Sequence, residues 1–246
     1  MSVSDVAGTG NAGGVPRPLA SPEPGLAMWW CPLACDTEAM AALWAMLSPE
    51  EVARAERFGT DALRLRYVVG RSALRRTLGQ RLGIEPAAVP IRRGARGRPM
   101  LEGARAPDFN VTHTLGVALI AHLDRPGWRV GVDIEGVDRT LSHDALARKF
   151  LTGRERAAIA TLDDDARRRA FLRLWTCKEA MSKATGEGLI APFREIGIDT
   201  AAGLAVAEGP GPYAPHRWTL HPVPVSDDLY ATVALWSADA SGSNPR

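Results

Sequence analysis

The 246-residue sequence has little of what disulfide-rich, zinc-binding or membrane-spanning proteins require. Its three cysteines, Cys31, Cys35 and Cys177, are too few and too scattered for a disulfide framework, and the first two lack a Cys/His pair at zinc-ligand spacing. No apolar run is long enough to cross a bilayer, and the N-terminus lacks the basic and apolar segments of a secretory signal. The formal net charge of only +2 provides no global field for nucleic acid or a membrane surface. We therefore expect a soluble, cytoplasmic protein with no nucleic-acid and no membrane partner.

The sequence does contain the composition of a globular protein, with 46% hydrophobic and 24% charged residues, enough for one large domain or two small ones. Residues 1–25 and 241–246 are rich in small residues without periodicity, and we predict disordered tails there. A turn at Pro126-Gly127 divides the remainder into an N-terminal half, 26–127, and a C-terminal half, 128–240. Both halves mix helical and strand patterns, which predicts an α+β fold.

Apolar spacing, capping residues and period-two patterns locate the elements within these halves. Ser48-Pro49-Glu50-Glu51 is typical of a helix start, and Leu63, Tyr67, Leu74 and Leu78 are expected to form the apolar stripe of the helix that follows. Helices are predicted over 36–46, 48–58, 61–82, 141–150, 153–162 and 165–185. Strands are predicted over 110–114, 117–122, 129–135, 218–223 and 230–237.

Two carboxylates lie on one predicted strand, in the stretch Gly131-Val132-Asp133-Ile134-Glu135. Alternate side chains of a strand point to opposite faces, so the valine and isoleucine face a core while Asp133 and Glu135 share the other face, roughly 7 Å apart. Hard oxygen ligands without His or Cys nearby favour magnesium, which usually takes a few carboxylates together with substrate phosphates. Spacing alone leaves a second interpretation open, namely a strand end with two solvated acids.

A predicted helix later in the chain carries a second set of polar residues. Trp175, Glu179 and Lys183 follow i, i+4, i+8 spacing and therefore share a helix face. This face offers a third carboxylate for a metal and a cation for a phosphate. Alternatively, Glu179 and Lys183 form an exposed ion pair beside a core tryptophan.

Together, the stretches GVDIE and WTCKEAMSKATGEGL resemble the signature of the 4′-phosphopantetheinyl transferase superfamily, and in particular its larger, pseudo-dimeric, surfactin-type group. The resemblance extends over residues 48–189. Further matches in the expected order are the helical region 48–75, Gly97-Arg98-Pro99, Phe109-Asn-Val-Thr-His-Thr114, and Phe150 with Glu155. Leu115 departs from the family pattern, in which a glycine is common, and threonines at 112 and 114 replace serines.

The resemblance implies two structurally similar α/β halves, a pseudo-dimer, with the active site in the cleft between them. It implies transfer of the 4′-phosphopantetheine of coenzyme A to a serine of an apo acyl or peptidyl carrier protein, with 3′,5′-ADP as the second product. Asp133, Glu135 and Glu179 match acidic Mg²⁺ ligands. Glu179 also matches the group that removes the serine proton, and Lys183 the cation that stabilises or protonates the departing 3′,5′-ADP.

The resemblance also implies contacts to coenzyme A. His113 matches a histidine on a coenzyme A phosphate, Arg54 and Arg66 match basic positions near the 3′-phosphate, and Arg98 matches one beside the adenine. Thr112, Asp133 and Lys183 complete the implied coenzyme-binding set. The other arginines of this region, Arg57, Arg64, Arg71, Arg75 and Arg76, are expected mostly on a solvated helix face.

The implied partner is a carrier protein, for which Arg167, Arg168 and Arg169 offer a basic rim, although a solvated helix face explains them equally well. We expect Met181 and Leu189 to be core residues rather than carrier contacts. We also expect a monomer, because one chain supplies both walls of the cleft. Two alternatives to the transferase are a magnesium-dependent pyrophosphate hydrolase and a coenzyme A-binding scaffold without catalysis.

Overall fold

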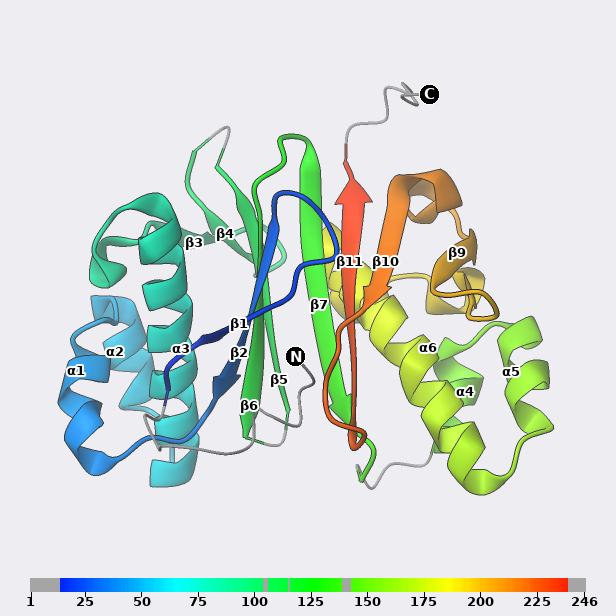
Figure 1. Ribbon diagram of the computed structural model, residues 1–246, viewed down its shortest axis with the longest axis horizontal. Coiled ribbons are helices and arrows are strands. Elements are labelled where there is room, and N and C mark those ends of the chain that lie inside the picture. The colour runs from blue at the N-terminus through cyan, green and yellow to red at the C-terminus, as the bar shows by residue number, and fades with distance from the viewer. Residues whose placement is uncertain (1–13, 104–105, 115, 139–142, 239–246) are drawn as a thin grey trace.

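The computed structural model describes residues 14–103, 106–114, 116–138 and 143–238. Two groups of helices flank a central block of strands (Figure 1). The helices are α1 (Met40–Trp44), α2 (Pro49–Ala55), α3 (Asp61–Leu82), α4 (His143–Phe150), α5 (Gly153–Ala160) and α6 (Asp164–Thr185). The strands are β1 (Arg17–Leu19), β2 (Leu26–Pro32), β3 (Ile91–Arg93), β4 (Pro99–Leu101), β5 (Asp108–Thr114), β6 (Val117–Leu123), β7 (Trp128–Gly136), β8 (Gly197–Asp199), β9 (Ala205–Glu208), β10 (Trp218–Pro222) and β11 (Leu229–Ser237).

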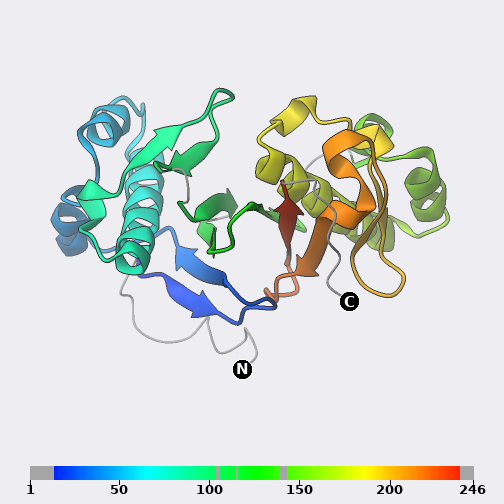
Figure 2. The ribbon, with the colours of Figure 1, turned by 90° about the horizontal axis from the view of Figure 1, so that it is seen from above.

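The central strands form two antiparallel sheets, and the chain passes from one to the other at the turn before β7. The first sheet has the order β1-β2-β6-β5 and the second the order β10-β11-β7. Figure 2 shows the two sheets facing each other, with the helices on their outer sides. An apolar cluster between the sheets includes Met28, Leu119, Val132 and Val233. Separate apolar clusters bury α3 against the first sheet and α6 against the second. Each half therefore has its own core, and the two halves share the apolar cluster between the sheets.

The two halves repeat one order of elements. The N-terminal half runs β2, α1, α2, α3, β3, β4, β5, β6, and the C-terminal half runs β7, α4, α5, α6, β8, β9, β10, β11. In both three-stranded cores the last strand lies in the centre, with the first strand and the penultimate strand on either side. The expected α+β fold with two similar halves is therefore observed in the topology itself.

Local sequence explains why the long helices begin and end where they do. The helices α3 and α6 each have 22 residues, and both end at a glycine in the left-handed conformation, Gly83 with φ +70° and Gly186 with φ +80°. The short helices α2 and α5, which precede them, each begin with a capping box, in which Ser48 pairs with Glu51 and Thr152 pairs with Glu155. Each signal lies within a few residues of its helix end, so the predicted bounds agree closely with those observed.

Several expectations need correction. The tail predicted over 1–25 is wrong where it overlaps β1, which pairs with β2. The rest of that prediction over 1–13, and the tail predicted over 241–246, lie outside the described residues. Leu63 does not belong to the apolar stripe of α3, because it is 48% exposed. Leu189, expected in the core, is 71% exposed, whereas Met181 is fully buried as expected.

The three cysteines are free thiols, as expected from their spacing. Cys31 and Cys177 are buried, and burial raises the pKa of each thiol to about 12. Neither is therefore a thiolate nucleophile at neutral pH. No helix in the described part of the chain is long and apolar enough to cross a membrane.

Candidate active site

The strand β7 carries both predicted carboxylates on its helix-facing side. Val132 and Ile134 belong to the core between the sheets, as the alternation predicted. A Cβ at Gly131 would lie 1.9 Å from the carbonyl oxygen of Ala180, so only glycine lets α6 pack this closely on β7. Asp133 is 4% exposed and Glu135 is 9% exposed. The alternative of two solvated acids is therefore excluded by their burial under α6.

Lys183 of α6 lies at the centre of a polar cluster that joins the two halves. Its Nζ is 2.6 Å from Asp133 Oδ1 and donates to Thr112 Oγ1 at 3.0 Å and to the carbonyl oxygen of Val132 at 3.3 Å. Thr112 in turn donates to Asp133 Oδ1 at 3.2 Å. The cluster combines β5 from the N-terminal half with β7 and α6 from the C-terminal half. Lys183 therefore pairs across the helix–strand junction rather than lying as an exposed cation on α6.

The shared face predicted for α6 is confirmed at both ends of that face. At one end of this face, Trp175 Nε1 donates to Glu135 Oε1 at 3.2 Å. At the other end, Lys183 contacts Asp133. Glu179 lies on α6 between these two contacts and is partly exposed. An indole and an ammonium thus fix the two strand carboxylates, and Glu179 lies on α6 between the residues that supply them, with access to solvent.

A buried ion pair on the other side of α6 fixes this helix in place. Lys178 is fully buried, and its Nζ contacts Glu155 Oε2 at 2.6 Å and the carbonyl oxygens of Phe150 and Phe193 at 3.1 and 2.9 Å. Burial lowers the pKa of Lys178, and the charge of Glu155 opposes that effect. Since Glu155 also accepts from the backbone nitrogens of Thr152 and Ile198, the pair ties α6 to the junction of α4 and α5, to the turn at Phe193 and to β8.

A row of polar side chains on β5 forms the junction with β7. Asp108 Oδ2 accepts from the nitrogen of Val130 at 2.8 Å, and Asn110 Oδ1 accepts from the nitrogen of Val132 at 3.1 Å. With Thr112 these residues alternate along one face of β5. Asp108 and Asn110 have no role predicted from the sequence, although the pattern Asp-x-Asn-x-Thr on a strand indicates a polar strand face.

The predicted coenzyme contacts divide into exposed and buried residues. Arg54, Arg66 and His113 are exposed, with the Arg54 guanidinium 5.5 Å from the centre of the Tyr67 ring. Arg98 is only 8% exposed, and protein acceptors surround its guanidinium. The structure thus brings Thr112, Asp133 and Lys183 together at the junction and leaves Arg54, Arg66 and His113 on the surface of the N-terminal half.

The expected solvated arginine face is wrong for two residues of α3. Arg75 is 3% exposed and pairs with Glu51, and Arg71 pairs with the same carboxylate. Arg75 also donates to the carbonyl oxygens of three residues after α3, namely Pro86, Ala87 and Val89. These arginines hold α2 against α3, and Arg75 also holds the segment that follows α3.

The donor chemistry of the site suits a hard cation. Asp133 Oδ2 is buried and has no hydrogen-bond partner in the described structure, and such an oxygen is costly unless a cation or water satisfies it. Asp133, Glu135 and Glu179 supply only carboxylate oxygens, which magnesium prefers. Within the described residues, no three acidic, histidine or cysteine side chains form a group that could hold a metal ion.

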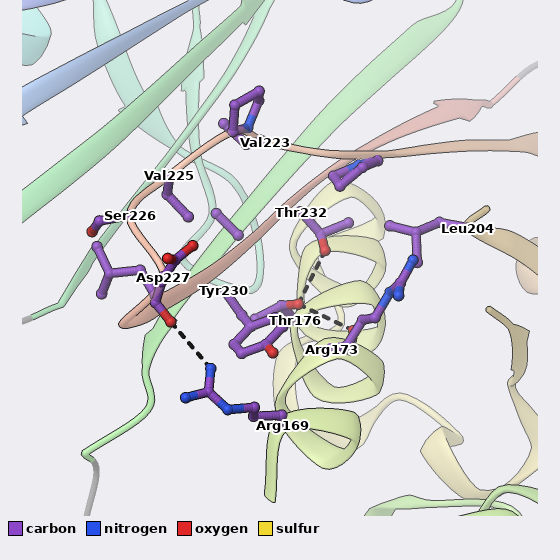
Figure 3. Close-up of a pocket in the computed structure, with 14 residues that line it drawn as sticks. Arg169, Arg173, Thr176, Leu204, Val223, Val225, Ser226, Asp227, Tyr230 and Thr232 are labelled. Carbon is purple, nitrogen blue, oxygen red and sulfur yellow. Dashed lines mark hydrogen bonds between the residues drawn. The ribbon is translucent and has the colours of Figure 1, made fainter. Parts of the chain in front are cut away.

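Two cavities lie elsewhere, on the helix side of the C-terminal half. One of about 470 Å³ lies between α6 and the β10–β11 hairpin, where Arg169 donates to the carbonyl oxygen of Asp227 at 3.2 Å (Figure 3). A second of about 550 Å³ is also lined by Arg169, Arg173 and Tyr230. Neither is lined by Asp133, Glu135, Glu179 or Lys183. The expected basic rim is partly neutralised, because Arg167 pairs with Asp164 while Arg168 and Arg169 pair with Asp165.

Comparison with known proteins finds family matches on both halves. Residues 29–123 match the N-terminal domain of 4′-phosphopantetheinyl transferases, and residues 129–234 match the 4′-phosphopantetheinyl transferase superfamily. The boundary between the matches falls at the turn between the two sheets.

Individual relatives agree with these matches. The chain is 35% identical over 212 residues to the 4′-phosphopantetheinyl transferase HetI of Nostoc sp., covering 85% of this chain and 86% of HetI. It is 23% identical over 152 residues to the 4′-phosphopantetheinyl transferase Sfp of Bacillus subtilis, covering 62% of this chain and 66% of Sfp. A holo-(acyl-carrier-protein) synthase of Bacillus anthracis, solved in complex with CoA (3′,5′-ADP), shares 20% identity over 45% of this chain and 96% of that chain, with a TM-score of 0.37. Because HetI aligns over most of both chains and the two family matches cover both halves, the chain belongs to the 4′-phosphopantetheinyl transferase superfamily.

Proposed function

We propose that the protein transfers the 4′-phosphopantetheine group of coenzyme A to a serine hydroxyl of an apo carrier protein, releasing 3′,5′-ADP, in a magnesium-dependent reaction. The observation that carries this proposal is the Lys183–Asp133–Thr112 cluster at the junction of the two halves, in a chain that aligns with HetI over most of its length. The repeated order of elements and the two successive family matches support placement in the larger group with two halves.

In this proposal the serine oxygen attacks the phosphorus that bears the pantetheine arm. A new oxygen–phosphorus bond forms, and the bond from that phosphorus to the bridging oxygen of the pyrophosphate breaks, with its electron pair leaving on 3′,5′-ADP. The serine proton passes to the carboxylate of Glu179, which is partly exposed and therefore accessible to a macromolecular substrate.

Lys183 stabilises the charge that develops on the leaving phosphate. Its ammonium is already oriented by Asp133 and Thr112, so little reorganisation is required during the reaction. Trp175 keeps Glu135 directed along the face that Asp133 shares.

Asp133, Glu135 and Glu179 would hold the magnesium ion. When bound, the ion neutralises charge on the pyrophosphate and lowers the barrier to attack by an alcohol. Coenzyme A would be bound by the basic surface of the N-terminal half, where Arg54, Arg66 and His113 are exposed. An acyl or peptidyl carrier protein is the proposed macromolecular partner.

Intact-protein mass spectrometry of apo carrier proteins tests this function. Each carrier is incubated with the protein, coenzyme A and magnesium, with and without EDTA. A gain of one phosphopantetheine that EDTA prevents and that Asp133→Ala removes is the expected result. Release of 3′,5′-ADP without any gain in carrier mass would instead indicate a hydrolase, and coenzyme A binding without either product would indicate a binding protein.

A further inference from the structure

Arg98 lies at the point where the hairpin β3–β4 meets the C-terminal half, and its guanidinium is completely engaged by the protein. Nε donates to the carbonyl oxygen of Lys183 at 2.8 Å. Nη1 donates to Asp108 Oδ1 at 2.8 Å and to the carbonyl oxygen of Pro99 at 3.4 Å. Nη2 donates to Asp108 Oδ2 at 2.6 Å and to the carbonyl oxygen of Val130 at 2.9 Å. A guanidinium has five N–H groups, and here five acceptors use them.

The acceptor at Lys183 is a helix-terminal carbonyl. The last carbonyl oxygens of a helix have no partner within the helix, and a cation at this end interacts favourably with the helix dipole. Lys183 lies in the last turn of α6, which Gly186 ends. A Cβ at Gly186 would lie 3.2 Å from Arg98 Cδ, so the arginine packs directly on the end of the helix.

The other acceptors lie on the two strands that meet between the halves. Asp108 belongs to β5, and its Oδ2 accepts both from Arg98 and from the nitrogen of Val130 on β7. Arg98 reaches the carbonyl oxygen of the same Val130. One arginine therefore fixes the backbone from which the Lys183 side chain extends and the segment of β7 that leads into Asp133.

We propose that Arg98 and Asp108 act together as positioning residues for the Lys183–Asp133 pair. This assignment replaces the contact to the adenine that the family resemblance suggested for Arg98, and it rests on the proposed transferase function. Arginine is required because its planar fork binds both oxygens of Asp108 while a third nitrogen reaches α6, which a lysine cannot reproduce.

The test is a double-mutant cycle with Arg98→Lys, Asp108→Asn and their combination, measuring kcat and the KM for coenzyme A. Each single variant is expected to lower kcat by about tenfold, because a small misplacement of a charged group is costly, while the KM changes by less than about twofold. The double variant is expected to be no slower than the slower single variant, since both remove the same coupling. Arg92→Lys is the matched control, because Arg92 is an exposed arginine of the same hairpin.

Two kinetic results would overturn the assignment. A higher coenzyme A KM in Arg98→Lys with Asp108→Asn unaffected would make Arg98 a coenzyme contact. An unchanged kcat in every variant, with only a lower melting temperature, would make the pair structural and nothing more.

The proposal stays testable if the wild-type protein transfers nothing, in which case the proposed function fails by itself. Hydrogen exchange then reports on the end of α6, where the nitrogens of Gly186 and Glu187 both donate to the carbonyl oxygen of Ser182. Faster exchange at these amides in Arg98→Lys and in Asp108→Asn, but not in Arg92→Lys, supports the positioning role. Unchanged exchange there contradicts it.

Discussion

The two halves of the molecule share one way of anchoring their long helices. In the N-terminal half, the capping-box residue Glu51 pairs with Arg75 of α3, and in the C-terminal half, the capping-box residue Glu155 pairs with Lys178 of α6. Arg75 and Lys178 each lie fourteen residues after the first residue of their 22-residue helix. Both also donate to backbone carbonyl oxygens of neighbouring segments, Pro86 for Arg75 and Phe150 for Lys178. The same kind of anchor therefore recurs in both halves.

The three carboxylates proposed for the reaction lie on the C-terminal half only. The residue after each anchoring cation is Arg76 in α3 but Glu179 in α6. In the N-terminal half, β2 presents Cys31 to its helices, whereas β7 presents Asp133 and Glu135 to α6. The position after each anchoring cation therefore differs between the halves although the framework is the same. The stability of each half depends on its anchoring ion pair and its core, and not on the residue next to the anchoring cation.

The largest effect is expected from breaking the anchor of the C-terminal half. Lys178→Met leaves Glu155 charged, buried and without its cation, and should lower the free energy of unfolding by about 3–5 kcal/mol. Arg75→Met in the other half should cost less, about 1–3 kcal/mol, because Arg71 still pairs with Glu51. Denaturant titration of both variants measures the difference. Equal losses would show that the two anchors are equivalent in energy.

The contrast between Glu179 and Arg76 is tested by activity. Glu179→Gln removes the proposed base and should lower kcat by about 10²-fold or more, with little change in stability. Arg76→Gln, at the same position of the other long helix, should leave kcat within about twofold, since Arg76 is half-buried on the N-terminal half and lies outside the proposed catalytic set. The readout is phosphopantetheine transfer followed by mass spectrometry. Full activity in Glu179→Gln would remove the base assignment.

The close contact between β7 and α6 gives the third prediction. In Gly131→Ala the new methyl group would meet the backbone of Ala180, so α6 must move and stability should fall by about 1–3 kcal/mol. Gly153→Ala is the control, because nothing lies within 4 Å of its added Cβ and its φ is not positive. Thermal unfolding compares the two variants, and equal melting temperatures would argue against tight packing at Gly131.

The smallest effect concerns acid stability of the N-terminal anchor. Burial raises the pKa of Glu51, but the charge of Arg71 and the hydrogen bonds from both arginines outweigh this, so the pKa lies below the ordinary value of 4.5. A carboxyl whose pKa is lower in the folded state stabilises the protein above the unfolded pKa and loses that contribution as the pH falls through the folded pKa. The wild-type advantage over Glu51→Gln should therefore be constant above pH 4.5 and should shrink below it. An advantage that does not depend on pH would contradict this.

Much of the secondary structure was predictable because its signals are local. The predicted helix over 61–82 coincides with α3, and the strand around Asp133 has the alternation that the sequence indicated. The short strands β3, β4, β8 and β9 were not predicted, because three or four residues are too few for a period-two pattern and their pairing depends on distant partners. The role of Glu51 was missed for a similar reason, since the sequence does not show that Arg71 and Arg75 return to it from α3.

The sequence by itself determined the helix ends, the alternation on β7 and the face of α6 that carries Trp175, Glu179 and Lys183, since each depends on residues within two or three turns of one another. Only the tertiary structure decided the partners. It paired Lys183 with Asp133 and Thr112 rather than leaving it exposed, buried both strand carboxylates, and turned Arg98 toward Asp108 and the end of α6. Pairing between charged groups depends on which elements pack against each other, and that packing is set by apolar burial over the whole chain rather than by the neighbours of any one residue.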